Sequence, residues 1–403
     1  MTLTHDDRTA LRHGRTAVYL LFLLSGTAIG TWTARIPAIK AGLGLSDGLL
    51  SVALLGIAAG AITGMQVVGR LVDRFGSTKV MLPMAFAQSA VLVPPALAPD
   101  LVSLTLALFA FGAVHGTLDV AMNANAVEVE RATGRSIMSS FHAAFSIGGF
   151  LGAAAGGILA GAGLSPAATF LAVAAAIAAM ALHASRRALT TVPAAPDPAA
   201  AGGAAPAGST GKENTGSTAG AGRGVLLLGA LAFCCMVGEG AAADWSSVYL
   251  HDLSGSDTLA AAAYAGFSVM MTAGRLAGDR LTARFGPAAL VRGCGLLAAA
   301  GLGTALLVGL PLAGVIGFAC FGAGLSCIVP QVFSAAGRRD PARAGRALAR
   351  VAALGYAGFL TGPALIGGAA EAVGLPRALV IPVLLAGFVA LAASALQDRS
   401  FTK

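Results

Sequence analysis

Three polar residues interrupt the apolar stretch of residues 101–127 at regular intervals. His115, Asp119 and Asn123 lie four positions apart, so an α-helix would place them on one face. An aspartate at the centre of a membrane helix costs about 2.5 to 3.5 kcal/mol on insertion scales, so such residues face a water-filled cavity or another helix. We interpret Asp119 as a carboxylate that binds and releases a proton near neutral pH. The alternative is a carboxylate held only by neighbouring hydrogen bonds.

Three further ionisable residues lie in or beside other apolar stretches. We expect Glu239 to face a cavity from the stretch 224–250. His142 could titrate near physiological pH, or it could be a hydrogen-bonded packing residue, and the same two interpretations apply to His115. Arg35 could attract anionic groups or pair with an acidic residue, and it could equally extend only to the membrane interface. These residues, with Asn123, are the candidates for proton coupling and solute binding.

A short basic segment occurs twice, about half the chain apart. Residues 69–76 read GRLVDRFG, and residues 274–286 read GRLAGDRLTARFG. A carboxylate at a helix end that faces basic groups can form an ion pair between helices, made in one conformation and broken in another. The alternative is a solvated loop whose charges only set the topology. The predicted gate residues are Gly69, Asp73, Arg74, Gly76, Lys79, Arg275 and Asp279.

The composition indicates that lipid surrounds most of the chain. Hydrophobic residues make up 56% and charged residues only 11% of 403 positions, and the mean hydropathy is +0.80, whereas about a quarter of the residues of a soluble domain are charged. We expect an all-α membrane protein with twelve transmembrane helices, each about 20 residues long. They are expected at 16–36, 46–69, 79–98, 101–127, 136–162, 165–185, 224–250, 258–278, 287–309, 311–336, 344–370 and 374–396.

The repeated segment divides the predicted helices into two sets of six. Residues 1–187 form one half and residues 223–403 the other, related by a pseudo-two-fold axis. Residues 188–222, rich in Ala, Gly, Pro, Ser and Thr, are expected to be a flexible cytoplasmic linker. Glycines spaced by four near 148–156 and 358–362 predict close contacts between helix backbones in each half.

The basic residues predict the orientation in the membrane. With the N-terminus inside, 23 of the 26 Lys and Arg residues fall on the inner side. The exceptions are Arg35, Lys40 and Arg377. This bias places both termini in the cytoplasm of a multi-pass protein of the cell (inner) membrane. It also accounts for the net charge of +8 without nucleic acid as a partner. The expected partners are a small-molecule substrate, protons and the lipid bilayer, and we expect a monomer.

The sequence offers no pattern typical of an enzyme or of a cofactor site. No Walker loop, HExxH helix or Gly-x-Ser-x-Gly elbow occurs in it. The five cysteines all lie within predicted membrane helices, away from clustered histidines, so we expect neither a zinc site nor a disulfide framework. We therefore predict no enzymatic activity, no cofactor and no metal.

The motifs resemble those of a known family. Gly69-x3-Asp73-Arg74-x-Gly76-x2-Lys79 resembles the loop 2-3 signature of the major facilitator superfamily. Leu118-Asp119-x3-Asn123, His142-x2-Phe145-x2-Gly148-x3-Gly152 and Gly266-Phe267-x6-Gly274-Arg275 are similar to elements of its fucose-permease-like branch of sugar and proton symporters. The resemblance implies the major facilitator fold and a role for Asp119 in proton coupling or substrate binding, with Glu239 as a family-like acidic residue.

Two residues depart from the patterns of the family. Asp119 stands where the sugar symporters usually have Glu, and Ala153 stands where the drug and proton antiporters have Pro. We expect a secondary active transporter that moves a small solute, with a sugar among the candidates, by alternating access and coupled to protons. The alternatives are a proton-coupled efflux antiporter for a drug or hydrophobic metabolite, and a non-transporting membrane sensor.

Overall fold

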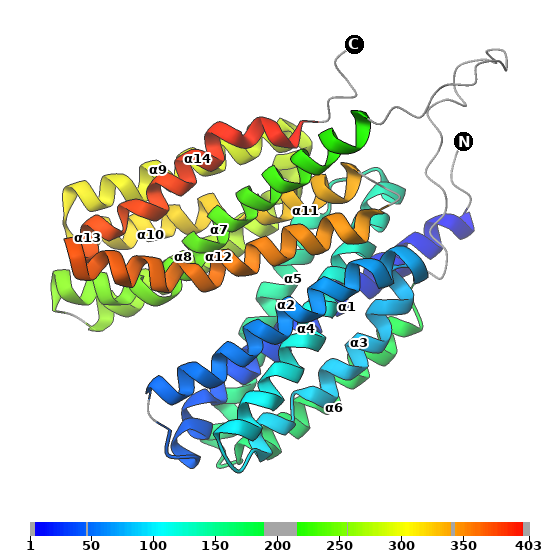
Figure 1. The fold of residues 1–403 in the computed structure, drawn as a ribbon, viewed down its shortest axis with the longest axis horizontal. Coiled ribbons are helices and arrows are strands. Elements are labelled where there is room, and N and C mark those ends of the chain that lie inside the picture. The colour runs from blue at the N-terminus through cyan, green and yellow to red at the C-terminus, as the bar shows by residue number, and fades with distance from the viewer. Residues whose placement is uncertain (1–4, 46, 189–215, 256, 340–342, 398–403) are drawn as a thin grey trace.

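The structure, a computed structural model, describes residues 5–45, 47–188, 216–255, 257–339 and 343–397. Over these ranges the chain forms helices and no β-strand (Figure 1). Most of the expected linker 188–222, and both ends of the chain, lie outside the described residues. The expectation of an all-α protein is confirmed for the part of the chain that the structure describes.

The first half of the chain forms one bundle of helices. Its elements are α1 (His5–Gly42), α2 (Asp47–Phe75), α3 (Ser77–Val91) with the 3-10 turn η1 (Pro94–Leu97), α4 (Leu101–Thr133), α5 (Met138–Gly161) and α6 (Pro166–Ser185). The second half forms a similar bundle. Its elements are α7 (Gly216–Ser254), α8 (Asp257–Phe285), α9 (Pro287–Val308), α10 (Pro311–Leu325), α11 (Ile328–Arg339), α12 (Ala344–Val373), α13 (Leu375–Ala378), α14 (Val380–Ala392) and η4 (Ala393–Leu396).

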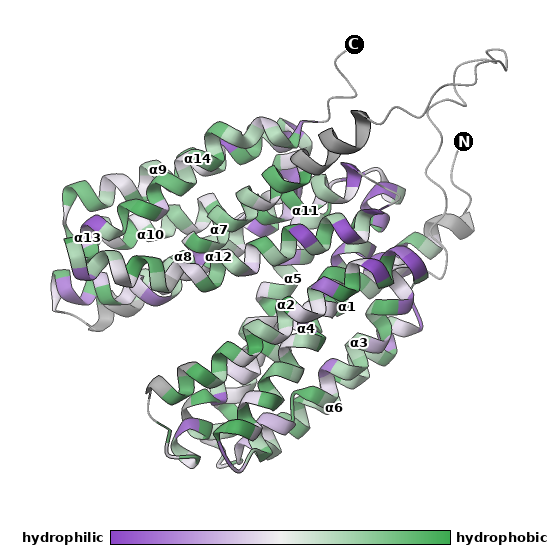
Figure 2. Cartoon of the chain, viewed as in Figure 1, coloured by the Kyte–Doolittle hydropathy of each residue, from purple (hydrophilic) through white to green (hydrophobic). Residues whose placement is uncertain are grey.

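Eleven helical segments of the described chain are long and apolar enough to cross a membrane. The segment Pro311–Arg339 joins α10 and α11, and Leu375–Leu396 joins α13, α14 and η4. The remaining long helix, α8, is less apolar because it is rich in small residues and carries Arg275 and Asp279. Figure 2 shows the apolar residues along the length of both bundles and polar residues gathered mainly at helix ends. With α8, the described helices account for the twelve crossings that the sequence predicts.

Close backbone contacts hold the helices of each half together. A side chain at Gly148 or Gly152 of α5 would overlap a carbonyl oxygen of α1, at Leu23 and Thr27 respectively. In the second half, Gly358 of α12 likewise lies against a carbonyl oxygen of α7. Small residues permit this approach where lipid and side chains are equally apolar. The predicted glycine contacts are therefore confirmed in both halves.

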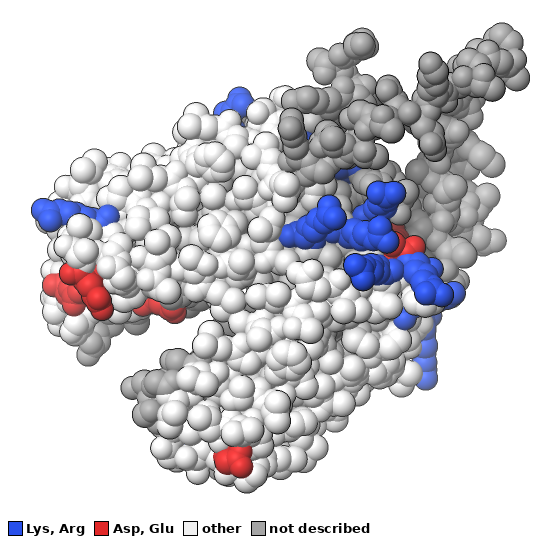
Figure 3. All heavy atoms as spheres, viewed as in Figure 1, with Lys and Arg blue, Asp and Glu red and all other residues white. Residues whose placement is uncertain are grey.

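The two bundles meet at one end of the molecule and diverge toward the other (Figure 1). In the space-filling view most of the visible Lys and Arg residues gather at the end where the bundles meet, and a cleft opens between the bundles from the opposite end (Figure 3). We call the first of these the arginine-rich end. It contains the junction of α2 with α3 and that of α8 with α9, where Gly76 and Gly286 adopt the left-handed φ values of 86° and 77°.

Candidate functional site

A cavity of about 150 Å³ lies between the two halves. Helices α1, α4 and α5 of the first half and α7, α8, α11 and α12 of the second half contribute to it. Its lining is mainly apolar and aromatic, with a small number of polar groups, as is usual for sites that bind small molecules. The lining residues are Phe22, Asp119, His142, Phe145, Ala232, Met236, Glu239, Arg275, Val329, Phe333, Ala352, Gly355 and Tyr356.

Asp119 brings a carboxylate to this cavity from the middle of α4. The amide of Asn123, one turn further along α4, donates to the Asp119 side-chain oxygen Oδ1 at 3.2 Å and to its backbone oxygen at 2.8 Å. No described cation forms an ion pair with Asp119, and the Asn123 Oδ1 has no hydrogen-bond partner among the described residues. Asp119 is thus a lone carboxylate in a cavity surrounded by membrane helices.

Glu239 and Arg275 face each other in the same cavity. The Arg275 Nη2 lies 3.4 Å from the Glu239 Oε1, and the two side chains are only 11% and 17% exposed. The Arg275 Nη1 also donates to the Ser146 Oγ at 2.7 Å, so Arg275 connects α8 of the second half with α5 of the first. The repeated segment predicted Arg275 as a gate residue, whereas the structure places it at the cavity. Its charge offsets that of Glu239 and leaves Asp119 without a counterion.

His142 completes the polar lining of the cavity. The rings of Phe22 and Phe333 meet its imidazole edge to face, with centroids 5.3 and 5.9 Å away. Its Nε2 has no hydrogen-bond partner among the described residues. A buried nitrogen without a partner is costly, so this atom can accept or donate a hydrogen bond when a polar group enters the cavity.

Two candidates from the sequence lie outside the cavity. The His115 Nδ1 lies 3.4 Å from the Ser25 Oγ inside the first half, and its ring stacks on Phe111. Arg35, which is 5% exposed, donates from Nη2 to the backbone oxygen of Leu164 at 2.7 Å, near the end opposite the arginine-rich end. Both residues therefore contribute to packing within the first half. Among the described residues, no group of three or more His, Cys, Asp and Glu could hold a metal ion.

Asp73 connects the two halves at the arginine-rich end. Its Oδ1 accepts a hydrogen bond of 3.0 Å from the backbone N–H of Gly345, at the start of α12. Its Oδ2 lies 3.1 Å from the Nε of Arg346. A carboxylate at the N-terminus of a helix is stabilised by the free N–H groups and the helix dipole there. A Cβ at Gly345 would lie 2.8 Å from the Asp73 Oδ1, so only glycine leaves room for this contact.

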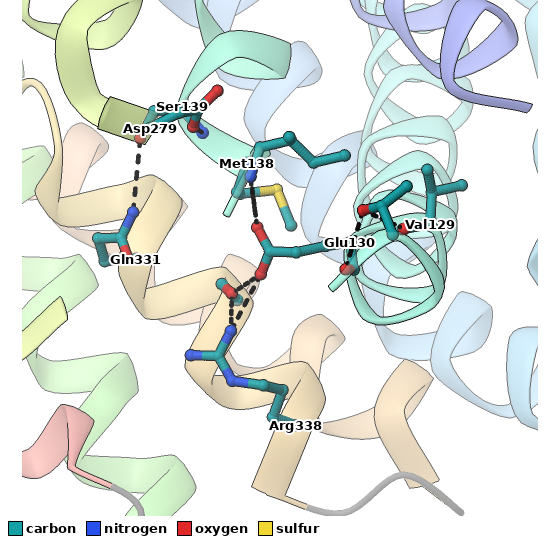
Figure 4. A network of polar contacts seen from close by, with 10 residues as sticks. Val129, Glu130, Met138, Ser139, Asp279, Gln331 and Arg338 are labelled. Atoms are coloured by element: carbon teal, nitrogen blue, oxygen red, sulfur yellow. Dashed lines mark hydrogen bonds and ion pairs between the residues drawn. The ribbon is translucent and has the colours of Figure 1, made fainter. Parts of the chain in front are cut away.

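Asp279 makes the corresponding contact between α8 and α5. Its Oδ1 and Oδ2 accept hydrogen bonds from the backbone N–H groups of Ser139 and Ser140, at 2.9 and 3.2 Å. These groups belong to the first turn of α5, so α8 of the second half caps a helix of the first (Figure 4). Both copies of the repeated segment therefore hold a helix of the opposite half.

Glu130 forms a third connection, which was not predicted from the sequence. It lies near the end of α4, and its Oε2 accepts the backbone N–H groups of Ile137 and Met138, each at 3.0 Å. Its Oε1 lies 3.0 Å from the Arg338 Nη1 and accepts the hydroxyl of Ser334, both on α11 (Figure 4). The sequence shows Glu130 and Arg338 just beyond the ends of two predicted membrane helices, but it does not show that they pair. We call the contacts of Asp73, Asp279 and Glu130 the clasp.

The other predicted gate residues of the first half lie beside the clasp. A Cβ at Gly69 would lie 3.0 Å from the Cα of Arg346, so the glycine lets α2 approach α12. Gly76 forms the turn into α3. The guanidinium of Arg74 lies 5.1 Å from the ring centroid of Phe75, and Lys79 is exposed. Arg74 and Lys79 add positive charge to the arginine-rich end, and neither takes part in the contacts that define the clasp.

Sequence comparison relates the chain to known transporters over nearly its whole length. The family model described as Major Facilitator Superfamily matches residues 17–363. An uncharacterized MFS-type transporter of Yersinia pestis is 34% identical over 378 residues, which cover 93% of this chain and 94% of the relative. The uncharacterized transporter y4wD of Sinorhizobium fredii is 36% identical over 385 residues, covering 94% and 96% of the two chains.

Structure comparison finds similar folds among solved transporters. The crystal structure of the transporter FucP in the outward conformation superposes with a TM-score of 0.76 and 17% identity, covering 95% of this chain and 98% of FucP. The Escherichia coli fucose:proton symporter FucP in another structure gives a TM-score of 0.75 at 18% identity, with the same coverage of both chains. At this level of identity the likeness concerns the fold.

Proposed function

Because this chain belongs to the Major Facilitator Superfamily and is a membrane transporter, we propose that it moves a small polar solute together with protons by alternating access. One observation carries the proposal. Asp119 lines the cavity between the halves with no cation beside it, while the other cavity carboxylate, Glu239, is paired with Arg275. A lone carboxylate within membrane helices is costly when ionised, so binding a proton there offsets that cost.

The cavity lining supports a solute with one polar and one apolar face. Phe22, Phe145 and Phe333 provide aromatic surface, and Tyr356 adds a hydroxyl group. His142, Asp119 and the Arg275 to Glu239 pair provide hydrogen-bond donors and acceptors. Sugars and related polyols have hydroxyl groups around a ring with apolar C–H faces, and this combination suits such a lining. The fold likeness to the fucose:proton symporter FucP is consistent with this proposal.

The apolar part of the lining favours a second candidate function. Val329, Met236, Ala232 and Ala352 contribute no polar side-chain group, and the aromatic residues enlarge the apolar surface. A hydrophobic metabolite or drug would bury its surface against these residues and be exported in exchange for protons. In this antiporter Asp119 would still carry the proton, but solute and proton would move in opposite directions.

We propose that the arginine-rich end lies in the cytoplasm of the cell (inner) membrane, as the positive-inside rule predicts. The clasp then closes the cytoplasmic side, and the cleft opens to the outside (Figure 3). The likeness to the outward conformation of FucP supports this orientation. Transport would require the clasp to open while the halves approach each other at the opposite end. Both halves of the chain line the cavity, so one chain can form a whole transport site, and we propose a functional monomer.

Flux into proteoliposomes tests the proposal. Thermal stability of the purified protein is first screened against sugars, polyols, organic acids and antibiotics, because a compound that binds the native state raises its stability. The best binder is then supplied outside vesicles that contain a pH indicator. Uptake with internal acidification supports symport, and uptake with internal alkalinisation supports the antiporter, because protons then leave as the solute enters. If no compound of these classes bound or moved across the membrane, both candidate functions would be overturned.

A further inference from the structure

We propose that a groove between α2 and α12 binds the headgroup and one acyl chain of an anionic phospholipid. The groove has a volume of about 760 Å³ and shares no lining residue with the cavity of Asp119. Both halves of the molecule contribute to it, and α7 adds one leucine. Its lining consists of Ile62, Met65, Gln66, Gly69, Arg70, Leu226, Arg346, Ala349, Arg350, Ala353, Leu354 and Ala357.

Three arginines concentrate positive charge at one end of the groove. Arg346 and Arg350 lie one turn apart on α12, and Arg70 faces them from α2. All three are exposed. Arg346 pairs with Asp73, whereas neither Arg70 nor Arg350 has an ion pair with a described residue. Three guanidinium groups against one carboxylate leave an excess of positive charge, and a phosphate suits it because guanidinium binds phosphate through two parallel hydrogen bonds.

The rest of the groove is apolar and fits a lipid chain. Met65, Leu226 and Leu354 lie on its walls, and Leu226 is 60% exposed. Along α12 the groove extends from Arg346 to Ala357, about 16 Å at 1.5 Å per residue. This is about half of the roughly 30 Å of hydrocarbon in a bilayer, which is the depth of one leaflet. A phosphate ion from water would occupy only the arginine end, whereas a phospholipid uses both parts.

The groove crosses the boundary between the halves. Its arginines belong to α2 and α12, the helices that Asp73 connects in the clasp. Like charges on the two helices repel, and a bound phosphate lowers this repulsion. A lipid in the groove therefore stabilises the state in which the arginine-rich end is closed. This inference depends on the groove and its charges, and it holds whichever solute the cavity carries.

Native mass spectrometry of the purified full chain tests the proposal. Phosphatidylglycerol and phosphatidylcholine of equal chain length are titrated onto the protein in neutral detergent. We expect phosphatidylglycerol to bind more tightly, and Arg70→Gln with Arg350→Gln to weaken it about 25-fold, at about fivefold for each arginine. Arg292→Gln is the matched control, because Arg292 is also exposed but lies on α9, outside the groove. It should bind phosphatidylglycerol like the wild type.

Two further measurements keep the result interpretable. The variant with Arg70→Lys and Arg350→Lys keeps both charges and should retain most of the preference, which separates lost charge from a folding defect. Inorganic phosphate at millimolar concentration should not displace phosphatidylglycerol. The proposal is overturned if the double Gln variant binds phosphatidylglycerol like the Arg292→Gln control, or if inorganic phosphate displaces the lipid completely.

Discussion

Asp73 and Asp279 make the same kind of contact from different turns of equivalent helices. Helices α2 and α8 both end in Arg-Phe before a glycine, but Asp279 lies one turn further from that end than Asp73 does. Each carboxylate nevertheless accepts backbone N–H groups at the start of a helix of the other half, at Gly345 and at Ser139 and Ser140. The two halves therefore make equivalent contacts, as the pseudo-two-fold relationship requires, although the aspartate lies one turn earlier in α8 than in α2.

The first prediction concerns this pair of capping carboxylates. Asp73→Asn and Asp279→Asn remove charge-assisted hydrogen bonds worth about 1.5 to 3 kcal/mol each, so each should shift the balance about 10-fold or more away from the closed arginine-rich end. Spin labels at Lys79 and Arg292, exposed positions of the two halves, would report this as longer distances between the labels. Asp252→Asn, at an exposed acid of α7, is the control and should leave the distances unchanged.

Arg346→Gln refines this test. Arg346 is 48% exposed, so its ion pair with Asp73 is worth about 1 kcal/mol or less. We expect a smaller shift than for Asp73→Asn, because the backbone contact to Gly345 stays in place. Equal shifts in the two variants would mean that the ion pair, and not the capped helix end, holds the halves together. If the distances between the spin labels stayed unchanged in both aspartate variants, the charges of the repeated segment would only set the topology and would not hold the halves together.

The second prediction concerns the packing of α5 on α1. A methyl group at Gly148 would overlap the carbonyl oxygen of Leu23, so Gly148→Ala forces the two backbones apart. Overpacking of this kind costs about 1 to 3 kcal/mol, and we expect a lower unfolding temperature in a thermal-shift assay. Gly157→Ala is the matched control on the same helix, because no atom lies within 4 Å of a Cβ there. Equal unfolding temperatures for the two variants would contradict the close contact.

The helices could be predicted from the sequence because the signals that define them are local. Length and apolar character fix each crossing, and spaced glycines mark the helices that touch. The sequence also identified Asp119 and Glu239 as candidates, since ionisable residues are rare in apolar stretches. The pairing of residues across the two halves was not accessible. Glu130 pairs with Arg338 only because the bundles dock in this orientation, and Arg275 meets Glu239 only because α8 packs beside α7 within the second half.

The third prediction concerns the ion pair of the cavity. Arg275→Gln leaves Glu239 as an unpaired buried charge, which costs about 3 to 5 kcal/mol when one partner of a buried pair is removed. We expect a clear loss of thermal stability. The double variant Arg275→Gln with Glu239→Gln removes both charges, so it should unfold close to the wild-type temperature while losing solute binding. A single variant as stable as the wild type would show that the pair contributes little to the fold.

The last prediction concerns Asp119, which we propose to carry the proton. One pH unit corresponds to about 1.4 kcal/mol, so a symporter that moves one proton with each solute sustains about tenfold accumulation across a gradient of one unit. Asp119→Asn mimics the protonated side chain. It should bind solute independently of pH and exchange labelled for unlabelled solute across the membrane, but it should not accumulate solute against its gradient.

Asp244→Asn is the control for this variant. Asp244 is an exposed carboxylate on α7 that does not line the cavity, so accumulation should persist when it is neutralised. If Asp119→Asn protein still accumulated solute about tenfold, the proton would have to use another group. His142 would then be the next candidate, because its Nε2 is buried at the same cavity without a described partner. Exchange without accumulation in Asp119→Asn, together with full activity in Asp244→Asn, places the coupling at the lone carboxylate of α4.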